Sequence, residues 1–150
     1  KEYRRQRQMC IRDRVKIQYR GNKIKISGNK KSIFETKKTI LNLFKEAQNG
    51  AEILTIPAAF TRPSGTAHWH VLQRARAIET GCFVLASAQI GTHDDGRQTY
   101  GHSLIINPWG EVLADAGTME EGFVIAEIDL SQVASARRKI RNLQHEPDYS

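Results

Sequence analysis

The chain has 150 residues, of which 39% are hydrophobic and 26% are charged. This composition allows one domain with a real core and excludes a largely disordered protein. The formal net charge of +7 is unevenly placed: residues 1–50 carry 15 Lys and Arg against 4 Asp and Glu, whereas residues 51–150 carry 8 against 12. Since no nucleic-acid recognition motif accompanies the basic part, nucleic-acid binding is only a minor alternative.

Membrane insertion and export are not expected from the sequence. No apolar run reaches the roughly 18 residues that span a bilayer, and the charged N-terminal part has no apolar segment like that of a signal peptide. Two cysteines, Cys10 and Cys82, are too few for a disulfide framework. We therefore expect a cytoplasmic protein that does not bind a membrane.

The first predicted elements follow a basic N-terminal segment. Residues 1–22 show no sustained hydrophobic period and are predicted to be a disordered or non-native arm. A short strand is expected at Lys23–Ile26, and a helix is expected over 32–50, where Ser32 and Glu35 have the spacing of a capping box. The apolar stripe of this helix consists of Ile33, Phe34, Ile40, Leu41, Phe44 and Ala47.

The next segments alternate between buried strands and a helix. Asn49–Gly50 is a good helix stop, because glycine accepts the left-handed conformation there. The short apolar run AEILTIP (51–57) is typical of a strand covered on both faces. A second helix is expected over Ala67–Thr80, and CFVLASAQIG (82–91) has the pattern of another buried strand.

The following part has a more polar pattern with turn signals. THDDGRQTYG (92–101) is predicted to be a loop with a turn at Asp95–Gly96. HSLIINPWGEVLADAG (102–117) is predicted to form two strands joined by the tight turn Asn107–Gly110.

The last part is expected to hold one more strand and one more helix. GFVIAEIDL (122–130) is predicted to be a strand, and 131–140 a helix with Ser131 as its cap. Residues 141–150 are polar and expected to be extended. The alternation of helices and apolar strands indicates a layered α/β fold.

Histidines suggest a metal site only superficially. His68 and His70 are two apart, so on a helix they lie about 200° apart and cannot easily share an ion. His93, His102 and Cys82 fall on other predicted elements without the spacing of zinc ligands. We therefore expect no metal, with one histidine at a helix interface and the other in solvent.

Nucleophile candidates are also weak when judged from the residues alone. Ser64 and Ser103 have no GxSxG context and no base at a diagnostic offset. Cys82 begins an apolar strand, as expected for a small core residue. Cys10 differs, because Arg12 and Arg14 would lower the pKa of its thiol electrostatically.

The helix predicted at Ala67–Thr80 carries residue types that are common at interfaces. Trp69, Arg74 and Arg76 are of the kinds enriched in binding hot spots. Arg76 and Glu79 also have the i,i+3 spacing of a salt bridge on a helix surface.

From residue 50 onward the sequence resembles the C-terminal part of the nitrilase superfamily of carbon–nitrogen hydrolases, in its amidase-like branch. Four stretches carry this resemblance in order: GAEILTIPAAFTRPSGTAHWHVLQRARAIETGCFVLASAQIG, YGHSLIINPWGEVLADAG, VIAEIDL and ARRKI. The resemblance is strongest over 50–143. It predicts 23–150 to be a partial carbon–nitrogen hydrolase domain.

The resemblance implies a four-layer α-β-β-α sandwich, of which this chain holds a part. It implies hydrolysis of an amide or nitrile of a small molecule without a cofactor, by a Cys nucleophile with a Glu base and a Lys that stabilises the intermediate. It places the pocket rim at Pro57, Ala58, Ala59, Phe60 and Thr61. It makes the second helix, with His68, Trp69, Arg74 and Arg76, part of a homo-oligomer interface.

The catalytic set is where the sequence departs from this family. Cys10, Arg14, Tyr19 and Arg20 match four offsets of a motif like CYDxRFPxxYR, but the RFP core is missing and no Glu and Lys partners are identified. The segment from Lys23 to Gly50 also resembles the first strand and helix of the family, and QMCIRDR resembles translated adapter sequence. We therefore expect a fragment or chimera, with Cys10 as the candidate nucleophile. The alternative is a catalytically silent binding or scaffold fragment whose basic arm contacts acidic partners or nucleic acid.

Overall fold

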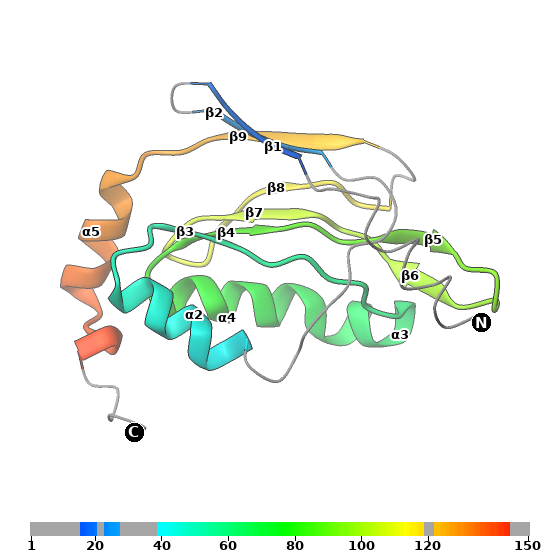
Figure 1. The fold of residues 1–150 in the computed structure, drawn as a ribbon, viewed down its shortest axis with the longest axis horizontal. Helices are drawn as coiled ribbons and strands as arrows, with labels where there is room; N and C mark the ends of the chain where they lie inside the picture. Colours follow the sequence, from blue (N-terminus) through cyan, green and yellow to red (C-terminus); the bar gives the residue numbers. More distant parts are fainter. Residues whose placement is uncertain (1–15, 21–22, 28–38, 119–121, 145–150) are drawn as a thin grey trace.

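The computed structural model describes residues 16–20, 23–27, 39–118 and 122–144. Three sheets and several helices make up this part of the chain (Figure 1). The strands are β1 (Lys16–Arg20), β2 (Lys23–Ser27), β3 (Ile53–Thr55), β4 (Phe83–Ala86), β5 (Ile90–Thr92), β6 (Gln98–Tyr100), β7 (Leu104–Ile106), β8 (Val112–Asp115) and β9 (Phe123–Glu127). The helical elements are α2 (Thr39–Gln48), α3 (Arg62–Ser64), the π turn η1 (Gly65–Trp69), α4 (His70–Thr80), α5 (Ser131–Lys139) and the 3-10 turn η2 (Asn142–Gln144).

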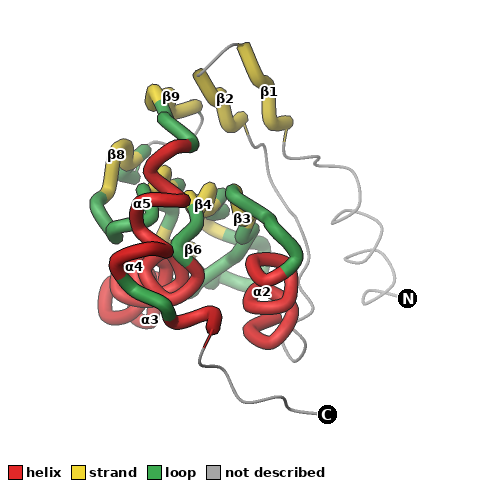
Figure 2. The backbone as a smooth tube through the Cα atoms, turned by 90° about the vertical axis from the view of Figure 1, so that its left-hand side faces the viewer, coloured by secondary structure: helices red, strands yellow, loops and turns green. Residues whose placement is uncertain are grey.

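The elements stack in layers. A four-stranded sheet in the order β3-β4-β7-β8 lies above the helices α2 and α4, and a second sheet in the order β1-β2-β9 lies on its other side (Figures 1 and 2). The pair β3–β4 is parallel, with Leu54 opposite Val84, and its crossover is the helical run from α3 to α4. The other neighbours in both sheets are antiparallel. The predicted layered α/β fold is therefore confirmed, with three layers of the sandwich formed by the described residues.

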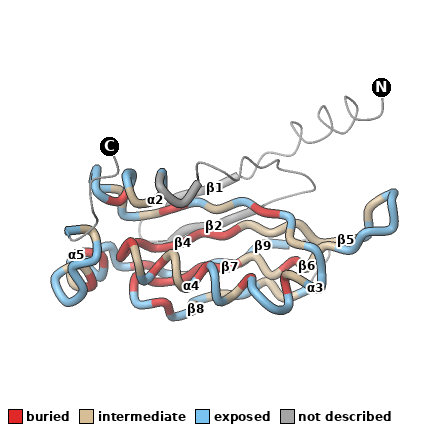
Figure 3. Tube along the Cα trace, turned by 90° about the horizontal axis from the view of Figure 1, so that it is seen from below, coloured by how far each residue is buried: buried red, intermediate tan, exposed pale blue. Residues whose placement is uncertain are grey.

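Two apolar clusters fill the space on the two faces of the central sheet. Successive strand residues point to opposite faces, so Val84 of β4 joins the cluster on the helix side while Leu85 joins the cluster between the sheets. Ile106 and Ile105 of β7 divide in the same way. Because β4 and β7 are buried along their whole length, they form the central red band of Figure 3.

Most of the predicted elements agree with the structure in type and place. The first helix ends at Gln48, and Gly50 follows with φ +97°. The strands expected from 51–57, 82–91, 102–117 and 122–130 correspond to β3, β4, β7 with β8, and β9. The turn Asn107–Gly110 joins β7 to β8, and the Gly110 N–H donates to the Asn107 carbonyl at 2.9 Å.

Four predictions need correction. The basic arm expected over 1–22 contains the strand β1, whose residues alternate polar and apolar and pair in antiparallel register with β2. The second helix begins at Arg62 rather than Ala67, since Thr61 is its extended N-cap and Pro63 suits the first turn. The loop predicted over 92–101 contains β6 and the last residue of β5, which pair as a hairpin, while the turn predicted at Asp95–Gly96 is confirmed.

The fourth correction concerns the start of α5. Leu130 is the N-cap residue, and the Asp129 carboxylate accepts hydrogen bonds from the Ser131 N–H and hydroxyl at 2.9 and 2.7 Å. Ser131 is therefore the first helical residue instead of the cap. The predicted capping box of Ser32 and Glu35 lies outside the described residues.

Candidate functional site

The segment predicted as a pocket rim, Pro57–Thr61, is an extended continuation of β3. The Ala58 N–H donates to the Ser87 carbonyl at 2.9 Å, and the Phe60 carbonyl accepts from the Tyr100 N–H at 3.0 Å. Ala58 is buried and Phe60 half-buried, while Pro57, Ala59 and Thr61 are exposed. This alternation, which is that of a strand, leaves three side chains of the segment facing solvent.

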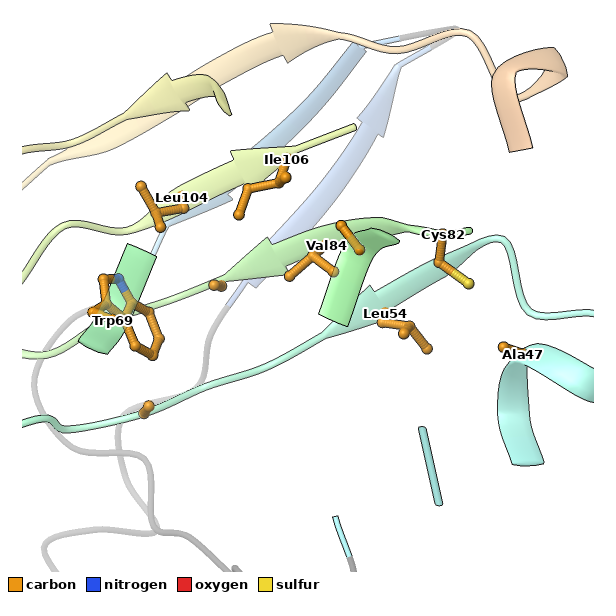
Figure 4. Close-up of a cluster of buried hydrophobic side chains, with 10 residues drawn as sticks. Ala47, Leu54, Trp69, Cys82, Val84, Leu104 and Ile106 are labelled. Atoms are coloured by element: carbon orange, nitrogen blue, oxygen red, sulfur yellow. The ribbon is translucent and has the colours of Figure 1, made fainter. Parts of the chain in front are cut away.

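Trp69, at the end of the π turn, lies in the core. Its side chain is 1% exposed and points into the cluster that contains Val84 and Leu104 (Figure 4). The indole N–H donates to the carbonyl of His102 at 2.7 Å, and the Phe60 ring packs against it with centroids 5.1 Å apart. Trp69 thus offers no surface to a partner in this fold, which corrects its predicted place on an exposed interface.

Immediately after Trp69, the chain turns a histidine toward a polar cluster. His70 Nε2 is 3.0 Å from Oδ2 of Asp115, and His102 Nδ1 is 3.0 Å from Oδ1 of the same carboxylate. The cluster therefore joins the start of α4, the connection between β6 and β7, and the end of β8. About a third of the His70 and Asp115 side chains and a fifth of the His102 side chain are exposed.

Aromatic rings fix the positions of the two imidazoles. The Tyr100 ring stacks on His102 with centroids 4.4 Å apart and an interplanar angle of 22°. The His70 ring meets the His102 ring edge-on at 5.1 Å. Gly65 lets the π turn approach Tyr100, because a Cβ at that position would lie 2.3 Å from the Tyr100 side chain. Such π turns are frequent at functional sites.

The backbone around His102 is held in an unusual conformation. His102 has φ +60°, which costs on the order of 1–3 kcal/mol for a residue other than glycine. Its N–H donates to the Gly117 carbonyl at 2.8 Å, and the Gly117 N–H in turn donates to Oδ1 of Asp115 at 2.7 Å. These contacts offset the strain and set the direction of the imidazole, together with the hydrogen bond that the Trp69 indole N–H donates to the His102 carbonyl.

The electrostatics of the cluster favour a charged carboxylate. Partial burial is the largest single influence on Asp115 and acts to raise its pKa. Hydrogen bonds from the His70 ring, the Gly117 N–H and the His102 ring act in the opposite direction, and the net result is a pKa of Asp115 below its ordinary value. At neutral pH the Asp115 carboxyl group is therefore ionised, and it lies between the two imidazole rings.

The cluster was not found from the sequence, although His70 and His102 were both considered as ligands. Helical spacing predicts that His68 and His70 point in different directions, and in the structure His68 is exposed while His70 is half-buried. The feature that brings His102 and Asp115 together is strand pairing, because the register that places Leu104 opposite Asp115 also brings His102 close to this carboxylate. Long-range pairings of this kind are set by the turn Asn107–Gly110.

The two arginines of the predicted interface have partners within the chain. Arg74 is exposed and its Nε donates to the Gly110 carbonyl at 2.7 Å. Arg76 forms the predicted salt bridge with Glu79. The first contact joins α4 to the β7–β8 turn, and the second lies within α4.

The nucleophile candidates have structural explanations where they are described. Cys82 is fully buried, and its Sγ lies 3.2 Å from the Ala51 carbonyl and 3.1 Å from Nη2 of Arg137, which confirms its prediction as a core residue. The Ser103 hydroxyl accepts a hydrogen bond from the Ala88 N–H. Cys10 lies outside the described residues.

A separate hollow of about 440 Å³ lies at the other end of α4. Its walls come from α2, the end of α4, α5 and η2, and they include Glu79, Arg137 and Arg141. Since α4 rises about 1.5 Å per residue over eleven residues, this hollow is a different place from the His70 cluster. Within the described parts of the chain, no helix has the length and apolar character needed to cross a membrane.

Comparison with known proteins identifies the family. The family model described as carbon-nitrogen hydrolase matches residues 33–138. The chain belongs to the carbon–nitrogen hydrolase family. The resemblance to the nitrilase superfamily that the sequence motifs carried is thereby confirmed.

Individual relatives agree with this assignment. The chain is 48% identical over 99 residues to a deaminated glutathione amidase of Synechocystis, covering 66% of this chain and 36% of the relative. It is 50% identical over 99 residues to the deaminated glutathione amidase of Homo sapiens, covering 66% of this chain and 30% of that one. The crystal structure of the C. elegans NitFhit protein superposes with a TM-score of 0.64 at 43% identity, covering 69% of this chain and 25% of that chain. The chain thus spans about a third of the length of these curated amidases.

Proposed function

We propose that this chain forms one wall of the active-site pocket of an amidase, which in its complete form hydrolyses the carbon–nitrogen bond of a small amide. The observation that carries the proposal is the family match over residues 33–138, which includes the rim segment Pro57–Thr61 and the whole of α4. The chain is 48% and 50% identical to two amidases that are named for deaminated glutathione. Deaminated glutathione and simple ω-amides are therefore the first compounds to test.

The proposed reaction follows the Cys-Glu-Lys chemistry implied by the family resemblance. A cysteine thiolate attacks the amide carbon, and a lysine stabilises the oxyanion that forms. The carbon–nitrogen bond then breaks, and the nitrogen takes the proton that the glutamate had accepted from the cysteine thiol. It leaves as ammonia from a primary ω-amide, or as the amine of the peptide part from deaminated glutathione, and a thioester remains. Water activated by the glutamate hydrolyses the thioester, giving the carboxylate and the free thiol.

The described residues contribute shape to this reaction. Ala59 and Thr61 are exposed on the rim, and Phe60 ties that segment to Trp69 of the core. Cys82 does not fit the nucleophile, because its sulfur is fully buried and already hydrogen-bonded. Cys10 remains our candidate for the nucleophile, with Glu and Lys partners supplied by the complete enzyme.

A chimera tests the proposal. Residues 50–143 replace the corresponding segment of the Synechocystis deaminated glutathione amidase, whose own Glu, Lys and Cys stay in place. We expect the folded chimera to hydrolyse deaminated glutathione, since this segment then supplies the pocket wall. A chimera that melts cooperatively but shows no turnover above that of a Cys-to-Ala variant would contradict the proposal.

The chain alone is the matching control. Removal of catalytic partners that act as a unit costs several orders of magnitude in rate, so we expect no turnover of ω-amides by the 150-residue chain. Turnover that disappears in Cys10→Ala would instead establish Cys10 as the nucleophile. Salt-dependent binding of nucleic acid together with an inactive chimera would favour the binding or scaffold alternative.

We propose also that the complete enzyme is a homo-oligomer that uses the outer face of α4. Val71 is 66% exposed on this helix, and Trp109 in the neighbouring β7–β8 turn is 55% exposed. His68, Arg74 and Arg76 lie on the same helical run. Light scattering on the chimera checks this: Val71→Glu should lower the mass of the assembly, whereas Ile125→Glu on β9, at a position that is 52% exposed, serves as the control. An assembly whose mass is unchanged in Val71→Glu would exclude this face.

A further inference from the structure

We propose that His70, His102 and Asp115 form a binding site for a divalent transition-metal ion of the zinc type. Each residue offers one ligand atom, and these atoms all lie within 4.8 Å of one another. The proposal rests on this cluster alone and is independent of the proposed amidase chemistry.

The spacing of the three donors is close to that of a coordinated set. Zinc bonds of roughly 2.0–2.1 Å in tetrahedral geometry place ligand atoms about 3.3–3.5 Å apart. The two nitrogen–oxygen separations in the cluster are 3.0 Å. Small rotations of the His70 and Asp115 side chains would therefore bring all three donors around one ion.

The kind of donor selects the kind of ion. Two imidazole nitrogens and one carboxylate oxygen are the protein ligands of many three-residue sites for zinc and other first-row metals. Mg²⁺ and Ca²⁺ instead prefer sites made of oxygens. The partial exposure of all three side chains leaves a way in for the ion and room for water as a further ligand.

Contacts behind the ligands orient them, as is usual at metal sites. The Gly117 N–H donates to the Asp115 carboxylate at 2.7 Å, and Tyr100 stacks on the His102 ring. The Trp69 indole fixes the backbone of His102 from the core side. The ligands therefore come from three different elements that are held in place before an ion binds.

The experiment is a zinc titration of the untagged 150-residue chain after removal of metal by a chelator. Calorimetry should show one saturable Zn²⁺ site per chain, and Zn²⁺ should raise the melting temperature because it binds the folded state. MgCl₂ in the same titration should show no saturation. Absence of a saturable Zn²⁺ site would overturn the proposal.

Variants assign the site to these residues. His70→Gln, Asp115→Asn and His102→Asn each remove one ligand, and Asn tolerates the left-handed backbone at position 102. Each should weaken Zn²⁺ binding at least about 100-fold. His68→Gln is the matched control, since it removes an exposed histidine from the same helical run and should leave the affinity unchanged. Equal affinities in all variants, or an equal loss in His68→Gln, would refute the assignment.

A measurement on the unmodified chain covers the case in which a variant does not fold. X-ray absorption of the zinc-loaded chain should show nitrogen and oxygen neighbours with the scattering pattern of two imidazoles. A sulfur neighbour would place the ion at a cysteine and contradict the proposal.

Discussion

Trp69 and His70 are neighbours in the chain, yet they belong to regions of opposite character. Trp69 lies with Val84 and Leu104 in an apolar cluster whose members are almost completely shielded from water. His70 lies in a polar cluster that keeps between a fifth and a third of each side chain exposed and includes a strained backbone at His102. Stability is expected to come from the first region, and ligand chemistry from the second.

The largest expected effect is the loss of Trp69 itself. Trp69→Ala should lower the free energy of unfolding by about 3–5 kcal/mol, because it leaves a cavity beside β4 and β7 and an unpaired His102 carbonyl. Trp109→Ala is the control, as Trp109 is 55% exposed and contacts Lys139 from the ring face, which is worth less than about 1 kcal/mol. Urea denaturation measures both. Equal losses of unfolding free energy in the two variants would mean that the buried Trp69 stabilises the fold no more than the exposed Trp109 does.

The next effect is at the boundary between the two regions. Gly65→Ala would place a Cβ 2.3 Å from Tyr100, and we expect overpacking to cost about 1–3 kcal/mol. In the double variant with Tyr100→Gly the two losses should not add, since the second change removes both the Cβ and the ring that the new methyl group would meet. A double-mutant cycle by urea denaturation checks this. Strict additivity would mean that Gly65 and Tyr100 do not meet.

An effect of similar size concerns a buried polar residue at the start of the β7–β8 turn. Asn107 is 7% exposed, and its Oδ1 accepts from the N–H groups of Trp109 and Glu111 at 3.0 and 2.9 Å. Asn107→Ala should cost about 1–3 kcal/mol, because both donors lose their acceptor in the turn. Glu111→Gln keeps the two backbone contacts and should cost less. If thermal denaturation shows a larger loss of stability in Glu111→Gln than in Asn107→Ala, the hydrogen bond between the two side chains contributes more than the two backbone contacts.

The smallest expected effect is a pH dependence at the start of α5. Hydrogen bonds from the Ser131 hydroxyl and N–H hold the pKa of the exposed Asp129 carboxyl below its ordinary value. Because the pKa is depressed in the folded state, this contribution to stability is present above the unfolded value of about 3.9 and is lost as the pH falls through the folded pKa. Asp129→Asn should therefore flatten the acid limb of a plot of urea midpoint against pH. An unchanged acid limb would show that these bonds do not favour the charged form.

Local patterns were sufficient to predict the apolar region. The continuous apolar runs around Val84 and along Leu104–Ile106 mark buried strands, because burial on two faces demands apolar residues at every position. Gly50 marks the end of a helix, and Asn107–Gly110 marks a reversal of the chain. Both places need a glycine with a positive φ, which few other residues accept. The start of α3 could also have been predicted, since Thr61 and Pro63 are N-terminal signals of a helix.

The polar cluster could not be predicted in this way. His70, His102 and Asp115 lie on three elements, and only the pairing of β7 with β8 brings the latter two together. The strand β1 was missed because a high density of Lys and Arg hid its alternation in residues 16–20. The burial of Trp69 was missed since residue type suggested an interface, whereas its position relative to β4 decides its environment.

The central claim is that residues 57–61 form a pocket rim in an amidase, and one measurement tests it directly. In the Synechocystis chimera, Ala59→Trp adds bulk to an exposed rim position, and Ala134→Trp adds the same bulk to an exposed position of α5. We predict that kcat/KM for deaminated glutathione falls at least ~10-fold in Ala59→Trp with an unchanged melting temperature, while Ala134→Trp keeps its activity. Equal kcat/KM values in the two folded variants would contradict the account.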